Sequence, residues 1–281
     1  MGVVIITSII FNTLIITSTY TVKRSERTKL MLTKSSLAFL DIFNGLILIA
    51  YGLLKDTTCF NVGEYHIQCD DVAINILTTL INFCLASSYL HVCLMSFQMY
   101  KAIVHELDYR LVTHKRQFLY ILLTYVLGIP ISIPVYLVRQ SHLSVQILYV
   151  NSGLMLGAYS LSVFCTMTVC YVYFRKRIQT SQINQVQRSR NPQRHLKFVL
   201  TVTFLVIGYA ITTLPYNILY LICGWRCSEQ FSLTLRNVFG FLLNCNIFVD
   251  ILVYSVLDDT FQKHVRSVFS KLLFPCRKLT P

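Results

Sequence analysis

Charged residues are scarce in this chain. Only 13% of its 281 residues are Asp, Glu, Lys or Arg, whereas 54% are hydrophobic. A water-soluble domain carries about 25% charged residues, because its surface must be hydrated. The composition therefore excludes an ordinary soluble protein and indicates one that lies in a membrane.

Motifs of catalysis and of secretion are also missing. The sequence has no HExxH, GxSxG or phosphate-binding P-loop motif and no paired CxxC, so nothing indicates an enzyme. It has no N-x-Ser/Thr glycosylation sequon either. Residues 1–22 lack the positively charged start of a cleavable signal peptide, which predicts a first membrane span instead.

Long apolar segments recur along the chain. They cover residues 2–22, 31–54, 71–104, 117–138, 145–174, 196–223 and 231–256. Each is long enough to cross about 30 Å of hydrocarbon as an α-helix, which satisfies its own backbone hydrogen bonds in lipid. The alternation of a membrane β-strand is absent. The sequence therefore predicts an all-α membrane protein, with a seven-helix bundle over residues 1–257 and a tail over 258–281.

The basic residues lie on one side of these predicted spans. All but four of the 25 Lys and Arg residues fall in the segments 23–34, 101–116, 175–197 and 263–278. Cytoplasmic loops carry the excess of positive charge, so we expect a C-terminus in the cytoplasm and an N-terminus outside the cell, at the plasma membrane. The net charge of +13 then reflects topology, and its expected partners are anionic lipid or a protein, not nucleic acid.

The tail has the pattern of an amphipathic helix. Acids begin the segment 258–274 and bases follow, which suits the helix dipole. Its apolar residues fall near one helical face: Phe261, Val265, Val268, Phe269 and Leu272. We expect this helix to lie on the inner leaflet, with Cys276 as a candidate palmitoylation site.

Ionisable side chains inside the predicted spans are few. Asp41 lies in the second span and Asp250 in the seventh. A carboxylate in lipid needs a partner, a proton or a cation, so both are candidate functional groups. For Asn12, Ser88 and Asn246 the alternative is that they only join helices by hydrogen bonds. His91 in the third span is expected to be a packed core residue.

The third span ends in QMYKAIVHELDY, from Gln98 to Tyr109. From Tyr100 onward this segment resembles the DRYxAIVHPLxY segment of rhodopsin-like G-protein-coupled receptors. Gln98 and Met99 depart from it, because the family has an acid and an arginine there. The resemblance extends along the chain, and its other residues are Asn12, Leu37, Ala38, Asp41, Pro215, Asp250, Tyr254 and Phe261. The chain is thus similar to a divergent member of this family, of the orphan or the chemosensory type.

The resemblance implies three groups of site residues. The ligand pocket would contain Ile81, Asn82, Leu85, Tyr216, Asn217, Tyr220 and Asn244. A sodium ion would be held by Asp41, Ser88, Asn246 and Asp250, whose oxygens suit a hard cation. Activation and coupling would involve Gln98, Met99, Tyr100, Tyr171, Pro215 and Tyr254, with Tyr171 as the partner of Tyr254. The alternative for Tyr171 is an interfacial anchor.

The outer loops lack the family's usual disulfide. Residues 139–149 contain no cysteine, and Cys69 lies earlier than the family pattern places it. Cys59 with Cys69, and Cys223 with Cys227, are candidate local bridges on the outer side.

Three functions are compatible with these features. The leading one is a receptor that passes the signal of an extracellular ligand to a heterotrimeric G protein. Because Ile81 replaces the acid of amine receptors, we expect a neutral small molecule or peptide as the ligand. The second is a receptor-like decoy or heteromer partner that does not couple, which the loss of arginine at Met99 favours. A transporter or channel is the third, although the chain shows no inverted repeats or polar pore lining.

Overall fold

A computed structural model describes residues 2–21, 29–58, 72–105, 109, 111–141, 146–183, 192–226, 238, 240–242, 245–257 and 259–273. In chain order its helices are α1 (Gly2–Thr21), α2 (Lys29–Thr58), α3 (Val72–Val104), α5 (His114–Ser141), α6 (Gln146–Ile183), α7 (Pro192–Arg226), the 3-10 helix η1 (Cys245–Phe248), α9 (Val249–Leu257) and α10 (Asp259–Leu273).

The helices coincide with the predicted apolar segments. Each of the first six segments coincides with most of one long helix, and η1 and α9 cover the described end of the seventh. Within the described ranges, five helices are long and apolar enough to cross a membrane: those containing Met31–Leu54, Val72–Val104, His114–Ile133, Gly153–Lys176 and Val199–Leu219. The prediction of an all-α, multi-pass membrane protein is therefore confirmed. Helix α6 continues past its predicted end, to Ile183.

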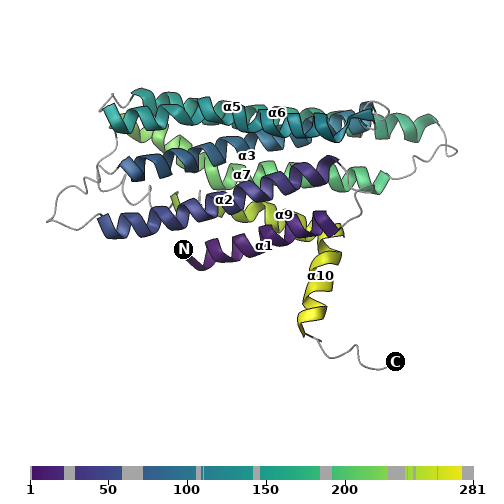
Figure 1. Ribbon diagram of the computed structural model, residues 1–281. Coiled ribbons are helices and arrows are strands. Elements are labelled where there is room, and N and C mark those ends of the chain that lie inside the picture. Colours follow the sequence, from purple (N-terminus) through teal and green to yellow (C-terminus); the bar gives the residue numbers. More distant parts are fainter. Residues whose placement is uncertain are drawn as a thin grey trace.

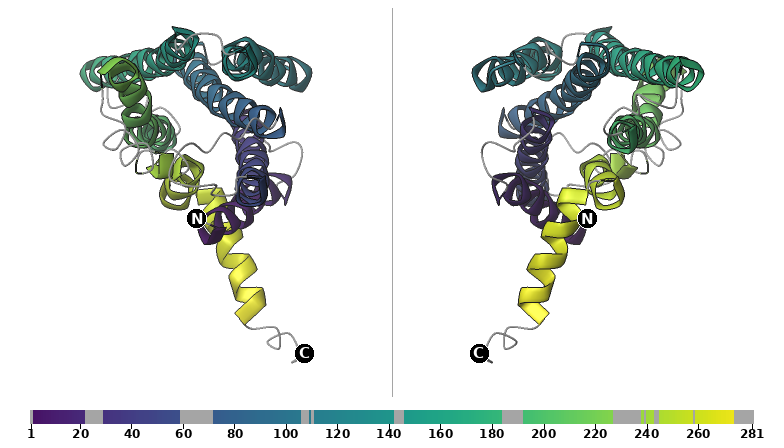
Figure 2. Two further views of the ribbon diagram at one scale, coloured as in Figure 1. Left: turned by 90° about the vertical axis from the view of Figure 1, so that its left-hand side faces the viewer. Right: turned by 90° about the vertical axis from the view of Figure 1, so that its right-hand side faces the viewer.

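The long helices lie side by side, and α10 leaves the bundle at a steep angle beside the end of α1 (Figure 1). Seen along their length, they surround a central region to which α2, α3, α7 and α9 all contribute (Figure 2). Helix α3 is the most central element, because it packs against α2, α5, α6 and α7. Residues that face several helices at once are therefore found mainly on α3.

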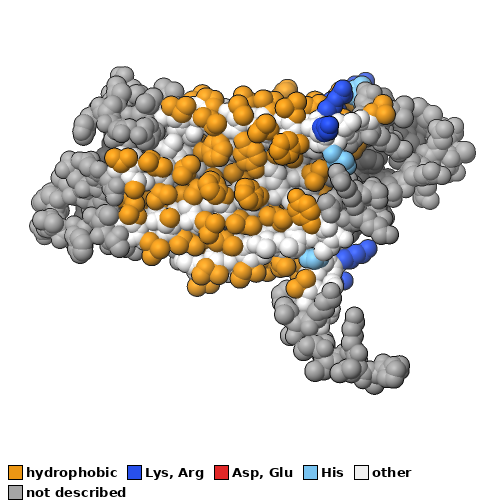
Figure 3. All heavy atoms as spheres, viewed as in Figure 1, with side chains coloured by type: hydrophobic (Ala, Val, Ile, Leu, Met, Phe, Trp, Pro, Cys, Tyr) orange, Lys and Arg blue, Asp and Glu red, His pale blue; other side chains and the backbone are white. Residues whose placement is uncertain are grey.

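The outer surface is apolar over most of its length. Large hydrophobic side chains such as Phe39, Phe118 and Phe164 are exposed on it. In Figure 3, hydrophobic side chains cover the flank of the bundle, whereas Lys, Arg and His gather at the end from which α10 projects. This is the surface expected of a helical bundle in lipid, where the outward faces contact hydrocarbon.

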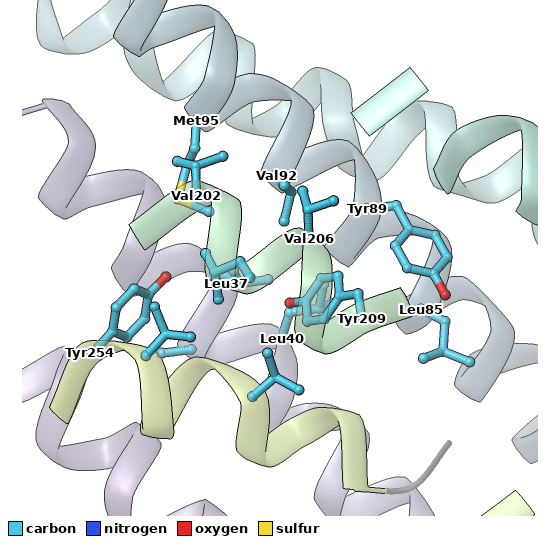
Figure 4. Close-up of a cluster of buried hydrophobic side chains, with 14 of the residues drawn as sticks. Leu37, Leu40, Leu85, Tyr89, Val92, Met95, Val202, Val206, Tyr209 and Tyr254 are labelled. Carbon is cyan, nitrogen blue, oxygen red and sulfur yellow. The ribbon is translucent and has the colours of Figure 1, made fainter. Parts of the chain in front are cut away.

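The interior is filled by side chains from helices that are distant in sequence. In Figure 4, Leu37 and Leu40 from α2, Met95 from α3, Val202 from α7 and Tyr254 from α9 all lie in one buried cluster. Tyr89 of α3 also contacts the rings of Tyr159 and Tyr209 edge-on, with ring centroids 5.9 and 5.8 Å apart. This core fixes the polar groups described next.

Candidate functional site

Two buried carboxyl groups face each other in the centre of the bundle. Asp41 projects from α2 and Asp250 from α9, and both side chains are buried. They are close enough for each carboxyl group to act electrostatically on the other. The Tyr209 hydroxyl of α7 donates to Asp250 Oδ1 over 3.0 Å. One oxygen of each carboxyl, Oδ2, is buried without a hydrogen-bond partner among the described residues.

Asn246 of η1 lies one helical turn before Asp250 in the chain. Its Oδ1 accepts a hydrogen bond from Thr212 Oγ1 of α7 over 2.9 Å. We call Asp41, Tyr209, Thr212, Asn246 and Asp250 the carboxyl cluster. The structure thus brings α2, α7, η1 and α9 together around the acids that were predicted from sequence.

Ser88, the fourth predicted sodium ligand, is engaged elsewhere. Its hydroxyl donates to the backbone oxygen of Cys84, one turn back on α3, over 2.9 Å. By contrast, two buried amide oxygens have no partner among the described residues: Asn44 Oδ1, one turn along α2 from Asp41, and Asn12 Oδ1 on α1, which packs against α2. Buried oxygen acceptors without donors are what a hard cation or ordered water requires, so the residues present fit a cation.

A second polar group lies at the end of α3. The Gln98 and Gln117 amides both donate to Thr33 Oγ1, over 2.9 and 2.8 Å, and the three side chains are buried. The Thr33 hydroxyl can in turn donate to Gln98 Oε1 over 3.2 Å. This amide network, formed by Thr33, Gln98 and Gln117, joins α2, α3 and α5 without a charge. Gln98 is therefore fixed by neutral hydrogen bonds.

A third polar group surrounds His91 on α3. His91 Nδ1 lies 2.8 Å from the backbone oxygen of Ser87, so it must be the donor, and Nε2 then accepts from the Ser36 hydroxyl over 3.0 Å. The Tyr125 hydroxyl lies 2.8 Å from Ser36 Oγ, and Thr124 also contacts the ring. His91 is thus a fully buried core residue in an imidazole network of Ser36, His91, Thr124 and Tyr125.

Met99 and Tyr254 belong to the apolar core. Both side chains are buried in the same cluster. The Tyr254 ring also has a cationic neighbour: Lys34 Nζ of α2 lies 4.8 Å from its centroid. Lys34, which the charge distribution assigns to a cytoplasmic segment, is in fact only 4% exposed. The charge pattern gave no sign of this burial, although Lys34 precedes Asp41 by two helical turns and thus shares its face of α2.

The predicted pairing of Tyr171 with Tyr254 is not seen in this arrangement. Tyr171 is 64% exposed on the outer face of α6, whereas Tyr254 is fully buried. Tyr173, two residues further on, is the buried tyrosine of α6 and packs in the core that contains Tyr254. At the same end, Lys176 of α6 donates to the backbone oxygen of Ile103, the penultimate residue of α3. Tyr100 lies nearby, edge-on to His105 with centroids 6.1 Å apart.

The predicted ligand-pocket residues lie toward the other end of α3 and α7. Leu85 is buried, and Ile81 packs against the core. The amides of Asn82 and Asn217 donate to backbone oxygens of their own helices, at Thr78 and Thr213. Tyr216 is half-buried one residue after Pro215, which interrupts the hydrogen bonding of α7.

Several predicted residues cannot be placed. Asn244, Cys59, Cys69, Cys227 and Cys276 lie outside the described residues, and Tyr220 and Cys223 fall on the last turns of α7. Cysteines that the structure does describe as free thiols are Cys84, Cys93, Cys165, Cys170 and Cys245.

Comparison with known proteins agrees with this architecture. Residues 11–254 match the family model described as "7 transmembrane receptor (rhodopsin family)". A search of curated proteins gives no match. The matched range extends from the middle of α1 to Tyr254 and covers most of the chain. The protein therefore belongs to the rhodopsin family of seven-transmembrane receptors.

Proposed function

We propose that this receptor crosses the plasma membrane seven times, with its N-terminus outside the cell, and passes a ligand signal to a cytoplasmic heterotrimeric G protein. The family supplies the signalling role. The orientation is supported by exposed basic side chains in the first half of α5, α7 and α10, at the end of the bundle from which α10 projects (Figure 3): Lys115, Arg116, Lys197, Lys263 and Arg266. The positive ends of membrane helices face the cytoplasm.

In this proposal, α10 lies on the inner leaflet. Phe261 at its start is buried against the bundle, whereas Lys263 and Arg266 are exposed. The His264 ring lies 3.2 Å from the Thr17 hydroxyl of α1, and the Gln262 amide donates to the backbone oxygens of Ser255 and Val256. A helix attached at its start and basic on its exposed face suits an anionic membrane surface. Palmitate on Cys276 would strengthen this attachment.

The ligand is a neutral molecule or peptide that binds between the outer halves of α3 and α7. Ile81 stands at the predicted counter-ion position, and the described buried acids, Asp41 and Asp250, belong to the carboxyl cluster. A cationic amine would therefore meet no carboxylate among the described pocket residues. Ile81→Asp should reduce the response to a neutral agonist, because a charge enters an apolar site. An unchanged response would place the pocket elsewhere.

Signalling follows from a shift between two conformers, since a ligand that binds one better raises its population. We propose that Na⁺ stabilises the inactive conformer at Asp41 and Asp250, supported by their partnerless oxygens. If both acids are ionised, Lys34 compensates one negative charge and a single monovalent cation compensates the other.

A second candidate function is that of a decoy or heteromer partner without G-protein coupling. The observation that favours it is that both residues that depart from the family motif are buried. Gln98 is held by the amide network, and Met99 is 3% exposed in the core. Neither side chain offers a charge to a partner at the cytoplasmic end.

One experiment separates the two functions. G-protein activation is measured in cells that express the unmodified chain, Met99→Arg, Gln98→Asp or the double variant, at matched surface levels. Lys101→Met serves as a control, because it changes charge at the same helix end on a partly exposed side chain. Activation by the unmodified chain supports the coupled receptor. Activation that appears only with Arg at position 99 would show instead that the chain is a non-coupling member.

A further inference from the structure

Tyr209 of α7 belongs to both the carboxyl cluster and the aromatic core. Its hydroxyl donates to Asp250 Oδ1 of α9 over 3.0 Å. Its ring meets the ring of Tyr89 of α3 edge-on, with centroids 5.8 Å apart and the ring planes at 67°. Both tyrosines are 1% exposed, and Figure 4 shows them in the same buried cluster. A single side chain therefore joins Asp250 to α3.

The Tyr209 hydroxyl has two effects on the carboxyl group of Asp250. A hydrogen bond to a charged acceptor is stronger than one between neutral groups, so the hydroxyl favours the ionised carboxylate, which is the form that binds a cation. It also opposes rotation of the carboxyl group, because rotation would move Oδ1 away from its donor. Oδ2, which has no partner among the described residues, is thereby held in one place. Hydrogen bonds of this kind orient the carboxylate ligands of metal ions.

The position of the Tyr209 hydroxyl depends in turn on the rings behind it. Tyr89 also contacts Tyr159 of α6 edge-on, with centroids 5.9 Å apart. Seven residues further along both helices, the hydroxyls of Ser96 and Thr166 lie 3.0 Å apart, so the two rings are part of a longer interface between α3 and α6. Edge-on contacts of this spacing are favourable beyond the area that they bury. A movement of α3 or α6 relative to α7 would therefore displace the hydroxyl from its acceptor.

Helix packing explains the rings but not the hydroxyl of Tyr209. Helix α6 also contacts α7 directly, because the Tyr159 hydroxyl donates over 3.4 Å to the backbone oxygen of Val206, one turn before Tyr209. A phenylalanine at position 209 would supply the same ring to this interface. A buried hydroxyl needs an acceptor, and the acceptor here is an acid of the carboxyl cluster.

We propose that Tyr209 is a positioning residue for Asp250: its hydroxyl holds the carboxyl group with Oδ2 free for the cation, and its ring ties that arrangement to α3 and α6 through Tyr89. The inference rests on the proposed cation at the carboxyl cluster. It adds that cation binding strengthens the association of α3, α6 and α7, because coupling between two parts of a protein is reciprocal.

The test uses the purified full chain in lipid nanodiscs and follows the unfolding midpoint as NaCl replaces choline chloride at constant ionic strength. The dependence of the midpoint on NaCl concentration gives the dissociation constant of Na⁺, because a ligand of the folded state stabilises it by mass action. Tyr209→Phe keeps the ring and removes the hydroxyl, so this constant should rise about 10–100-fold. Tyr125→Phe is the matched control, because it removes a tyrosine hydroxyl that contacts Ser36 in the imidazole network. It should leave the dissociation constant unchanged, even where it lowers the midpoint.

The contribution of the rings is tested at Tyr89. Tyr89→Leu leaves the Tyr209 hydroxyl in place but removes the ring that supports it, so the dissociation constant should rise several-fold. In the unmodified chain, NaCl should slow hydrogen–deuterium exchange of the α6 amides near Tyr159, and Tyr89→Leu should abolish this slowing. The combined Tyr89→Leu and Tyr209→Phe variant should bind Na⁺ as weakly as Tyr209→Phe alone, because Tyr89 acts through the hydroxyl.

The outcomes separate the positioning role from the cation itself. A lower midpoint with an unchanged dissociation constant in Tyr209→Phe would show that the hydroxyl supports only the fold, which overturns the positioning role and leaves the cation in place. Additive effects on the constant in the combined variant would overturn the link through Tyr89. If the unmodified chain shows no difference between NaCl and choline chloride, the cation fails and the inference fails with it. None of these measurements requires a G protein, so they decide the inference whether or not the chain couples to one.

Discussion

Polar groups are buried on both sides of α2, but the two sides differ in how many of these groups have hydrogen-bond partners. Toward α3 and α5, the amide network and the imidazole network leave His91 and both glutamine amides paired. Toward α7 and α9, the carboxyl cluster leaves Asp41 Oδ2 and Asp250 Oδ2 without partners among the described residues. A saturated network holds helices in one arrangement, whereas an unsaturated one can accept a cation, water or a new donor.

This difference indicates which helix pairs are scaffold and which can rearrange. The paired groups of the two networks lose hydrogen bonds in any movement, so α2, α3 and α5 should remain together, although Ser87 Oγ on α3 is buried without a partner among the described residues. Where α2 faces α9, two buried acids each keep one oxygen, Asp41 Oδ2 and Asp250 Oδ2, without a partner among the described residues. We expect movement there, and each substitution below tests whether the division is correct.

Thr33→Val should have the largest effect. Valine keeps the shape of threonine but removes the oxygen that accepts from both buried amides, Gln98 and Gln117. Two unpaired amides cost about 2–5 kcal/mol together. We expect little folded protein at the cell surface and a clearly lower unfolding midpoint, whereas Thr33→Ser, which retains the oxygen, should fold. A well-folded Thr33→Val chain with altered signalling would place movement on this side of α2.

Two glycines lie where neighbouring helices approach each other closely. Replacing each of them should cause a loss of stability of intermediate size. A Cβ at Gly128 of α5 would collide with Ser87 Oγ of α3, and one at Gly208 of α7 would collide with Val249 of α9. Gly128→Ala and Gly208→Ala should each cost about 1–3 kcal/mol by overpacking.

The two glycine variants should differ in their consequences. Gly128→Ala acts on the scaffold and should mainly reduce stability, with rescue by Ser87→Ala. Gly208→Ala pushes α7 from α9 and should also speed hydrogen exchange in α9, with rescue by Val249→Ala. Equal rates of hydrogen exchange in α9 of the two variants would contradict the distinction between the α3–α5 side and the α7–α9 side of α2.

The sequence predicts the helices and the pairing of Asp41 with Asp250, but not which face of each helix points inward. The spans are visible because lipid demands long apolar segments. Their orientation is hidden because the lipid-facing side is as apolar as the core. Tyr171 and Tyr173 of α6 illustrate this. They are the same residue type two positions apart, but Tyr171 is 64% exposed and Tyr173 is 7% exposed.

Lys34 was missed for a related reason. A lysine near the end of a span is normally counted with the basic loop, because its long side chain can reach water. Its burial depends on the Tyr254 ring, which is distant in sequence. The amide network was missed because three neutral side chains, Thr33, Gln98 and Gln117, carry no spacing signal across helices.

Asp41→Asn and Asp250→Asn test the cation at the carboxyl cluster. We expect NaCl, compared with choline chloride at equal ionic strength, to stabilise the unmodified chain by about 1 kcal/mol if Na⁺ exceeds its dissociation constant several-fold. Each Asn variant should fold in choline chloride but lose this difference, because one negative charge is gone. The measurement is the unfolding midpoint in both salts. Retention of the difference in Asp41→Asn and Asp250→Asn would place the cation outside this cluster.

Ser88→Ala should have the smallest effect on stability. It also tests whether the cation site includes a ligand from α3 besides the acids of α2 and α9. The Ser88 hydroxyl donates to Cys84 of its own helix, so its loss should cost less than about 0.5 kcal/mol. The neighbouring Ser87→Ala is the matched control, because Ser87 faces Gly128 on the scaffold side. If Ser88→Ala weakens the NaCl-dependent shift and Ser87→Ala does not, the Ser88 hydroxyl turns from Cys84 toward the cation when it binds. If neither weakens it, Ser88 belongs with the saturated side of the bundle, and the acids of α2 and α9 hold the cation without α3.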